Sequence, residues 1–229
     1  MGVEADPSLV NGLPAQGTYW KARATCQNRK VYCLSEPTIG GAALLQHGVE
    51  YFNPDEAARR ILAANPTIIQ EDANSAAWHE GKRLLERAIT ERLNFAFETT
   101  LGGNTIPALL ARALESGIEL RVWYVGLTTP ELHVTRVRSR VERGGHDIPE
   151  VKIRERYHRS RLNLVRLIRK LTELRVYDNS EEADPHTGAL PQPILILHLD
   201  KGKVVNSCDL TTAPEWTKPI LLAALKSSK

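Results

Sequence analysis

Short apolar segments alternate with amphipathic helical segments along most of this chain, and this alternation constrains its fold more than any other feature. The apolar segments have the length and composition of strands that are buried on both faces of a sheet. They cover residues 31–34, 49–52, 94–98, 119–127 and 174–177. The helical patterns between them cover residues 55–64, 75–92, 106–115, 130–143 and 149–171. Strands that alternate with helices predict an α/β fold with a mostly parallel central sheet covered by helices on both faces.

The two ends of the chain depart from this alternation. Residues 1–30 have no clear hydrophobic period and many Gly, Pro, Asn and Gln residues, so we interpret them as a poorly patterned segment in front of a domain over 31–229. Near the C-terminus, the turn Asp200-Lys201-Gly202-Lys203 lies between two short apolar runs. This pattern predicts a terminal hairpin, which a last helix over 214–225 would follow.

The length and composition limit the class of protein. With 229 residues, the chain is long enough for one substantial α/β domain. No segment approaches the roughly 18 apolar residues that cross a membrane, and the N-terminus lacks the apolar core of a secretory signal. Cys26, Cys33 and Cys208 fit neither a disulfide framework nor a zinc-binding spacing. We therefore expect a cytoplasmic protein without a membrane partner and without metal-ligating residues.

Positive charge is concentrated in one stretch, although the net charge of the chain is only +3. Residues 136–170 hold twelve Lys or Arg against four Asp or Glu. Such a stretch favours an anionic partner, either the phosphates of a nucleotide or a nucleic-acid backbone, although a solvated helix face is an equally ordinary use of basic residues. Nucleic acid is the less favoured partner, because the chain shows no nucleic-acid-binding motif and its aromatic residues do not interleave with the basic ones.

Three motifs place polar groups where expected strands and helices end. Phe52-Asn53-Pro54-Asp55-Glu56 puts a carboxylate at a helix start, and Phe95-Ala96-Phe97-Glu98-Thr99-Thr100 ends a strand in a carboxylate and two hydroxyls. The third motif, Arg143-Gly144-Gly145-His146-Asp147-Ile148-Pro149, places a glycine hinge inside the basic stretch. Because the carboxyl ends of parallel strands share one edge of a sheet, we expect the two carboxylates to face one cleft. Two carboxylates opposite a hinged basic segment suit phosphoryl transfer.

Together with Ile153-Arg154-Glu155-Arg156-Tyr157-His158-Arg159-Ser160, Asn163-Leu164 and Tyr177-Asp178-Asn179-Ser180, these motifs resemble the zeta-toxin family of P-loop kinases, and more narrowly its chromosomal branch. The resemblance covers about residues 49–225. It implies a P-loop nucleoside-kinase-like three-layer sandwich with an arginine-rich helical lid at about 140–160. It also implies that ATP, with Mg²⁺, donates its γ-phosphoryl group to a hydroxyl of a UDP-amino sugar such as UDP-N-acetylglucosamine, or of a similar acceptor. An antitoxin protein is the implied partner.

The resemblance assigns roles to the polar residues at the strand ends. Asp55 is the implied general base for the acceptor hydroxyl, and a carboxylate that interacts with the helix dipole is the alternative. Glu98 would bind the acceptor or orient the magnesium shell, or would form a salt bridge to an arginine. Thr99 and Thr100 would bind acceptor hydroxyls or serve as turn residues. Asn53 is both a candidate acceptor-binding residue and a plausible N-cap.

Arginines supply most of the groups expected to bind the nucleotide. Arg136, Arg140 and Arg143 recur every three or four residues and so share a helix face, and Arg154 and Arg159 follow the glycine hinge. A lid that closes such arginines over the phosphates would stabilise the charge that spreads during transfer. We expect Arg140 and Arg154 to act in catalysis. The candidate nucleotide-binding residues are Gly40, Gly41, Arg136, Arg143, Arg159, Asp178 and Asn179.

The phosphate cradle of a P-loop kinase, G-x-x-x-x-G-K-[ST], has no match in this chain. Residues 36–44 align without a gap to the family's G-P-N-G-A-G-K-S-T, but only Pro37 and Gly41 keep their identity. Ala42 replaces the lysine and Ala43 the magnesium-binding hydroxyl. The chain is then a decayed kinase, a chain whose first 46 residues were altered by a frameshift or a wrong start, or a kinase with a different cradle built from the lid arginines.

The missing lysine and hydroxyl predict transfer that is slower by roughly 10³-fold or more. Two other functions stay open beside that of an impaired kinase. One is a catalytically dead pseudokinase that serves as a ligand- or protein-binding module. The other is nucleic-acid binding through residues 136–170.

Overall fold

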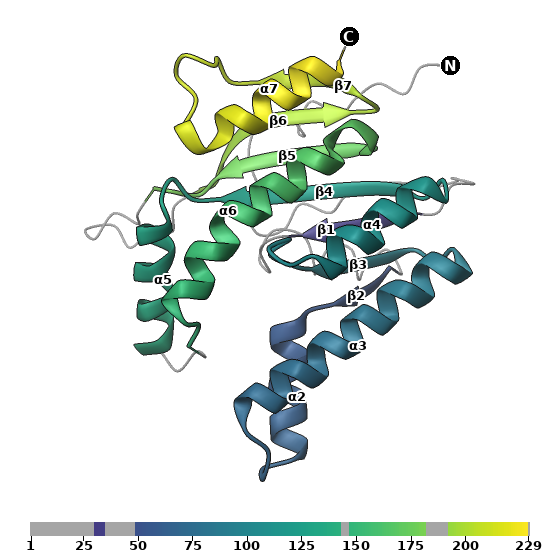
Figure 1. Ribbon diagram of the computed structural model, residues 1–229, viewed down its shortest axis with the longest axis vertical. Helices are drawn as coiled ribbons and strands as arrows, with labels where there is room; N and C mark the ends of the chain where they lie inside the picture. The colour runs from purple at the N-terminus through teal and green to yellow at the C-terminus, as the bar shows by residue number, and fades with distance from the viewer. Residues whose placement is uncertain (1–29, 35–48, 143–146, 182–191, 229) are drawn as a thin grey trace.

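The computed structural model describes residues 30–34, 49–142, 147–181 and 192–228 (Figure 1). Among these residues, seven strands form one sheet in the order β2-β3-β1-β4-β5-β6-β7. The first five strands of this order run parallel to one another. β6 runs antiparallel to β5, and β7 runs antiparallel to β6. The strands are β1 (Lys30–Leu34), β2 (Glu50–Phe52), β3 (Phe95–Glu98), β4 (Glu119–Gly126), β5 (Glu173–Asp178), β6 (Ile194–Asp200) and β7 (Lys203–Ser207).

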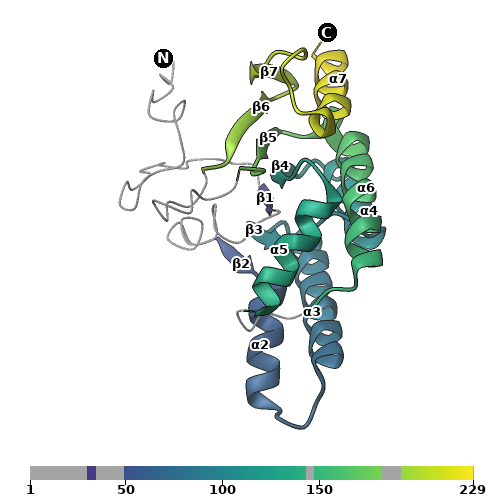
Figure 2. The same ribbon diagram turned by 90° about the vertical axis from the view of Figure 1, so that its left-hand side faces the viewer.

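Figure 2 shows the helices α3, α4, α6 and α7 along one face of the sheet. The core lies between them and the alternate residues of β4, where Leu120, Val122 and Tyr124 are buried. None of the described helices is long and apolar enough to cross a membrane. The helices are α2 (Pro54–Ala64), α3 (Gln70–Glu91), α4 (Thr105–Glu115), α5 (Pro130–Glu142), α6 (Glu150–Leu167) and α7 (Lys218–Ser227), with the short 3₁₀ helices η2 (Ile168–Lys170) and η3 (Glu215–Thr217).

The structure confirms the α/β class, the mostly parallel sheet, and the terminal hairpin with its helix. Two helix boundaries differ from the sequence expectation. The helix α3 begins at Gln70 rather than Ser75, because Glu71 and Asp72 in its first turn favour a helix N-terminus and Ala73 is buried against the core. The helix α6 ends at Leu167, and the chain then tightens into the 3₁₀ turn η2 instead of continuing to Leu171.

The strand order places the candidate site at one point of the sheet edge. β1 lies between β3 and β4, so the chain moves to one side of β1 for β2 and β3 and then to the other side for β4. Ligands of open α/β sheets bind at such a reversal, beyond the carboxyl ends of the strands. Leu34 pairs with Glu98 across β1 and β3, so Glu98 ends its strand at this reversal.

Candidate active site

Asn53 connects the ends of β2 and β3 at this edge of the sheet. Its side chain is buried, and its Oδ1 accepts hydrogen bonds from the backbone N–H groups of Asp55 at 2.9 Å and Glu56 at 3.0 Å. These bonds cap α2, and Pro54 follows at the first helical position. The Nδ2 of Asn53 donates to Oε2 of Glu98 at 3.1 Å. One side chain therefore starts a helix and orients a carboxylate, and it brings together two of the predicted site residues.

Asp55 lies in the first turn of α2, next to this pair, and its side chain is exposed. No described residue forms a hydrogen bond or ion pair with its carboxylate. A carboxylate at this position is stabilised by the helix dipole in any case. The structure therefore agrees with both interpretations of Asp55, whose exposed carboxylate lies in the helix turn that Asn53 caps.

Thr99 and Thr100 form the turn after β3. The Oγ1 atom of Thr99 accepts a hydrogen bond from the backbone N–H of Leu101 at 3.2 Å, and that of Thr100 accepts one from Gly102 at 3.4 Å. Both residues thus serve as turn residues. Each hydroxyl still has its own proton to donate, so acceptor binding by these threonines stays a prediction.

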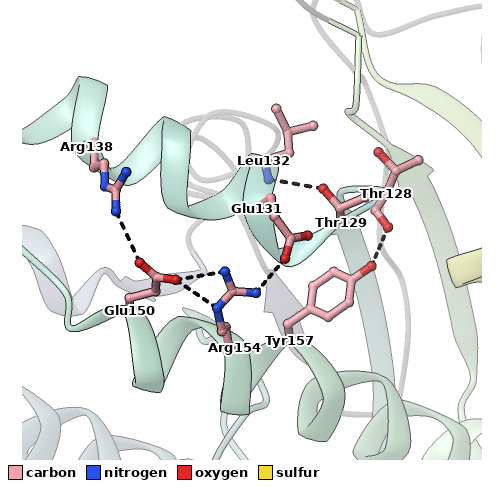
Figure 3. Close-up of polar contacts among 8 residues, drawn as sticks. All are labelled: Thr128, Thr129, Glu131, Leu132, Arg138, Glu150, Arg154 and Tyr157. Atoms are coloured by element: carbon pink, nitrogen blue, oxygen red, sulfur yellow. Dashed lines mark hydrogen bonds and ion pairs between the residues drawn. The ribbon is translucent and has the colours of Figure 1, made fainter.

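Arg154 on α6 is held by two carboxylates (Figure 3). Its Nη1 lies 2.5 Å from Oε1 of Glu131 on α5, and its Nε and Nη2 donate to Oε1 of Glu150 at 2.9 and 2.8 Å. The other oxygen of Glu150 accepts from Arg138 at 3.1 Å. The hydrogen bonds that Arg154 donates to Glu131 and Glu150 raise the pKa of Arg154, and the bond that Glu131 accepts from Arg154 lowers the pKa of Glu131. The guanidinium group predicted to bind phosphate is thus paired with carboxylates of the same two helices.

Arg140 differs from the other predicted lid arginines. Its Nε and Nη2 atoms are shielded from solvent and have no hydrogen-bond partner among the residues that the structure describes. Arg136 instead donates to the backbone carbonyl of Glu181 at 3.0 Å, and Arg159 forms an ion pair with Glu155 at 2.8 Å. Unpaired, shielded donors are costly, and an anionic oxygen would offset that cost. Phosphate binding by Arg140 stays a prediction, and these two donors without a partner among the described residues are compatible with it.

Aromatic and basic residues form the contact between α5 and α6. The ring of His133 packs edge-on against Tyr157 with centroids 5.5 Å apart, and the guanidinium of Arg161 lies 3.8 Å from the centre of the Tyr157 ring. The hydroxyl of Tyr157 donates to the backbone carbonyl of Thr128 (Figure 3). Burial, together with the nearby charges of Arg136 and Arg161, lowers the pKa of His133 to about 4. This histidine is therefore neutral at physiological pH.

Asp178 and Asn179, at the end of β5, form hydrogen bonds with the following turn, with β4 and with η3. Oδ1 of Asp178 accepts hydrogen bonds from the Ser180 hydroxyl and, at 3.3 Å, from Nε1 of Trp216. The backbone N–H of Asn179 donates to the carbonyl of Gly126 at 2.9 Å. These contacts give the Tyr177–Ser180 motif a structural role at the ends of β4 and β5. Nucleotide binding by Asp178 and Asn179 stays a prediction.

Several predicted site residues lie outside the described residues. They are Gly40 and Gly41 with the whole aligned cradle at 36–44, Arg143, and the hinge at Gly144–Gly145. Within the described ranges, no group of three or more His, Cys, Asp or Glu side chains could hold a metal ion.

The sequence did not identify the carboxylates that pair with Arg154. Glu150 precedes Arg154 by four residues, and this spacing on a helix indicates an ion pair between them. Glu131 comes from another helix, so no local pattern indicates its contact. Asn163 belongs to one of the motifs quoted above, but the motif does not indicate its contact. Its side chain donates hydrogen bonds to the loop after β3.

A family model and a curated protein match parts of this chain. The family model described as Zeta toxin matches residues 53–189. An uncharacterized protein of Haemophilus influenzae is 33% identical over 103 residues, which cover 45% of this chain and 71% of that protein.

Two solved structures share the fold at low sequence identity. A structure of AvrRxo1-ORF1 and AvrRxo1-ORF2 with ATP has a TM-score of 0.56 and 13% identity, over 88% of this chain and 64% of that chain. A structure of the same two proteins with sulphate ions has a TM-score of 0.53 and 14% identity, over 88% of this chain and 77% of that chain.

Proposed function

This chain belongs to the zeta toxin family, and from that premise we propose that it is a small-molecule kinase with an intact acceptor side and an impaired ATP side. The proposed reaction transfers the γ-phosphoryl group of ATP to a hydroxyl of a UDP-amino sugar, for which UDP-N-acetylglucosamine is the first candidate. We place it in the cytoplasm, where both substrates occur.

The observation that carries this proposal is the connection of Asn53, Asp55 and Glu98 at the sheet edge. Asn53 holds the Glu98 carboxylate by one hydrogen bond and sets the helix turn that presents Asp55. In the proposed reaction, Asp55 accepts the proton of the attacking hydroxyl. Glu98 accepts a hydrogen bond from a second hydroxyl of the acceptor and so orients it, which is the main requirement of phosphoryl transfer.

The lid supports binding of the phosphates. Arg140 offers two shielded donors without a partner among the described residues, and bidentate guanidinium contacts suit phosphate oxygens. Arg154 can bind a phosphate beside Arg140 only if its hydrogen bonds to Glu131 and Glu150 are replaced by bonds to phosphate oxygens. The structural neighbour solved with ATP supports ATP as the donor.

The impairment follows from the segment after β1. In the proposed alignment of residues 36–44, Ala42 and Ala43 take the places of the cradle's lysine and hydroxyl, a segment that precedes the family match at 53–189. The described residues include no group of three or more His, Cys, Asp or Glu side chains that could hold Mg²⁺. We expect transfer slower by roughly 10³-fold or more than in a kinase with an intact cradle. The same observation favours the second candidate function, a pseudokinase that binds its ligand without turnover.

Ligand binding to the full chain tests the two half-sites separately. We expect UDP-N-acetylglucosamine to raise the melting temperature, while Mg-ATP has a much smaller effect. Transfer from labelled ATP to the sugar should be weak, and Asp55→Asn should abolish it. Glu56→Gln, which changes the next exposed carboxylate of the same helix turn, is the matched control and should leave transfer unchanged.

Each arm of this experiment has an outcome against the proposal. Turnover close to that of a relative with a complete cradle would refute the impairment. A melting temperature that does not respond to the UDP-sugar would refute the acceptor. Equal transfer by Asp55→Asn and the wild type would refute the assignment of the base.

We also infer a protein partner of the antitoxin type. The family is named for a toxin, and both structural neighbours were solved as a pair of proteins. Light scattering of the chain, purified after expression with and without the product of the adjacent gene, would detect such a complex. An unchanged mass in both samples would argue against this partner.

A further inference from the structure

One buried side chain of α6 holds the loop that follows β3. The Nδ2 of Asn163 donates to the backbone carbonyl oxygens of Leu101 at 2.7 Å and Gly103 at 2.9 Å. Asn163 is only 6% exposed. Both of its amide protons are therefore used. The loop is attached at two points to α6, which is called the lid helix below.

The loop needs this support because of its backbone conformation. Leu101 is buried and has a φ of 53°, which lies in the left-handed region that residues other than glycine rarely adopt. Such a conformation persists where the surroundings hold it. The hydroxyls of Thr99 and Thr100 bond to the amides of Leu101 and Gly102, so the shape of the loop also fixes where these hydroxyls lie.

The loop also packs directly on the helix. A Cβ atom placed on Gly102 would lie 2.8 Å from Cβ and 3.1 Å from Cα of Arg156. No side chain fits between the loop and α6 at this point, and the backbone of α6 cannot give way easily. Arg154 and Arg159, two of the predicted phosphate-binding residues, lie on the same helix.

We propose that Asn163 is a positioning residue that couples the acceptor loop, residues 99–103, to the lid helix. The coupling itself rests on the contacts above, and only the identity of the acceptor rests on the proposed function. A movement of α6 that brings Arg154 to a phosphate would carry Thr99 and Thr100 with it. The donor and acceptor sides would thereby assume their active geometry together.

Hydrogen exchange of the full chain tests the coupling without any ligand. Asn163→Leu keeps the side-chain size and removes both donors. We expect the amides of residues 101–103 to exchange about tenfold faster or more, while those of β3 and α6 keep the wild-type rate. Arg166→Ala is the control, because it removes only the weak hydrogen bond that Nη1 of Arg166 donates to Oδ1 of Asn163 at 3.5 Å and keeps both donors of Asn163 to the loop carbonyls. Unchanged exchange of the loop, or an equal acceleration in α6, would overturn the proposal.

A second variant and a binding experiment separate positioning from general destabilisation. Gly102→Ala pushes the loop away from α6 and leaves Asn163 intact, so it should accelerate the same amides. In calorimetric titrations, both variants should weaken UDP-N-acetylglucosamine binding at least about fivefold and leave ATP binding unchanged. A parallel loss of both ligands would indicate a merely structural role. If the wild type does not bind the UDP-sugar, the proposed acceptor is wrong, and the exchange experiment still decides the coupling.

Discussion

The acid stability of this protein should depend on one buried carboxylate, Glu173. It is only 5% exposed and lies among Nη1 of Arg121 at 2.5 Å, Nε of Arg175 at 2.8 Å and Nε2 of His198 at 3.6 Å. Strand pairing brings these groups together, because Arg121 is opposite Glu173 and His198 is opposite Arg175. Burial alone would raise the pKa of Glu173, but the nearby imidazole of His198 and the charges of Arg175 and Arg121 outweigh it and lower the pKa to about 2.

The expected magnitude follows from this shift. A carboxyl group with an ordinary pKa of 4.5 that falls to about 2 on folding stabilises the folded state by about 3 kcal/mol. As the pH falls, the unfolded chain takes up the proton first. The stabilisation is therefore complete above pH 4.5 and is lost progressively between pH 4.5 and about 2. Glu173→Gln lacks this titration and removes the carboxylate shared by Arg175 and Arg121, of which Arg121 keeps its ion pair with Glu119 at 3.7 Å.

Urea unfolding, followed by circular dichroism at a series of pH values from 7 down to about 2, measures this effect. The difference in unfolding free energy between the wild type and Glu173→Gln should be largest above pH 4.5 and should shrink toward pH 2. Glu115→Gln removes an exposed ion pair with Lys170 and is the control, with little effect expected at any pH. A difference between the wild type and Glu173→Gln that does not change with pH would refute the reasoning.

Three further predictions concern the lid and the C-terminal packing. Folding lowers the pKa of His133, so the free energy of unfolding of the wild type should fall as the pH drops from 6.5 toward 4. His133→Phe should remove this pH dependence of the unfolding free energy, and an unchanged dependence would contradict the prediction. Gly126→Ala should cost about 1–3 kcal/mol in denaturant unfolding, because the new Cβ would lie 2.5 Å from the Trp216 ring. Glu131→Gln removes one carboxylate from Arg154, so titration calorimetry should show ATP bound a few-fold more tightly, and equal affinity would argue against phosphate binding by Arg154.

The sequence predicted those features that have a local cause. Asn53 followed by Pro54 indicated a helix start, and the structure shows the expected cap. The turn at Lys201–Gly202 indicated a hairpin, and both residues have the positive φ angles that such a turn requires. Strands ending in polar residues also placed Glu98 correctly at the sheet edge.

Contacts between distant segments could not be predicted in this way. The pair of Glu131 and Arg154 joins two helices, and Asn163 reaches a loop that precedes it by about sixty residues. Neither contact has a signature in residue spacing, because it depends on how α5 and α6 pack. The arginine pattern indicated a phosphate-binding lid, but only the structure distinguishes Arg140, with its unpaired donors among the described residues, from the paired Arg154.

The double role of Asn53 restricts which residues evolution can place at that position. Serine, threonine or aspartate would begin α2 about as well as asparagine does. Among these residues, only asparagine accepts from the helix and donates to Glu98 with two separate atoms, Oδ1 and Nδ2. Serine and threonine have a single hydroxyl oxygen for both bonds, and aspartate would set two negative charges against each other. A homologue with aspartate here would therefore still begin α2, but it would lose the hydrogen bond that orients Glu98, so this position separates the orientation of that carboxylate from the start of the helix.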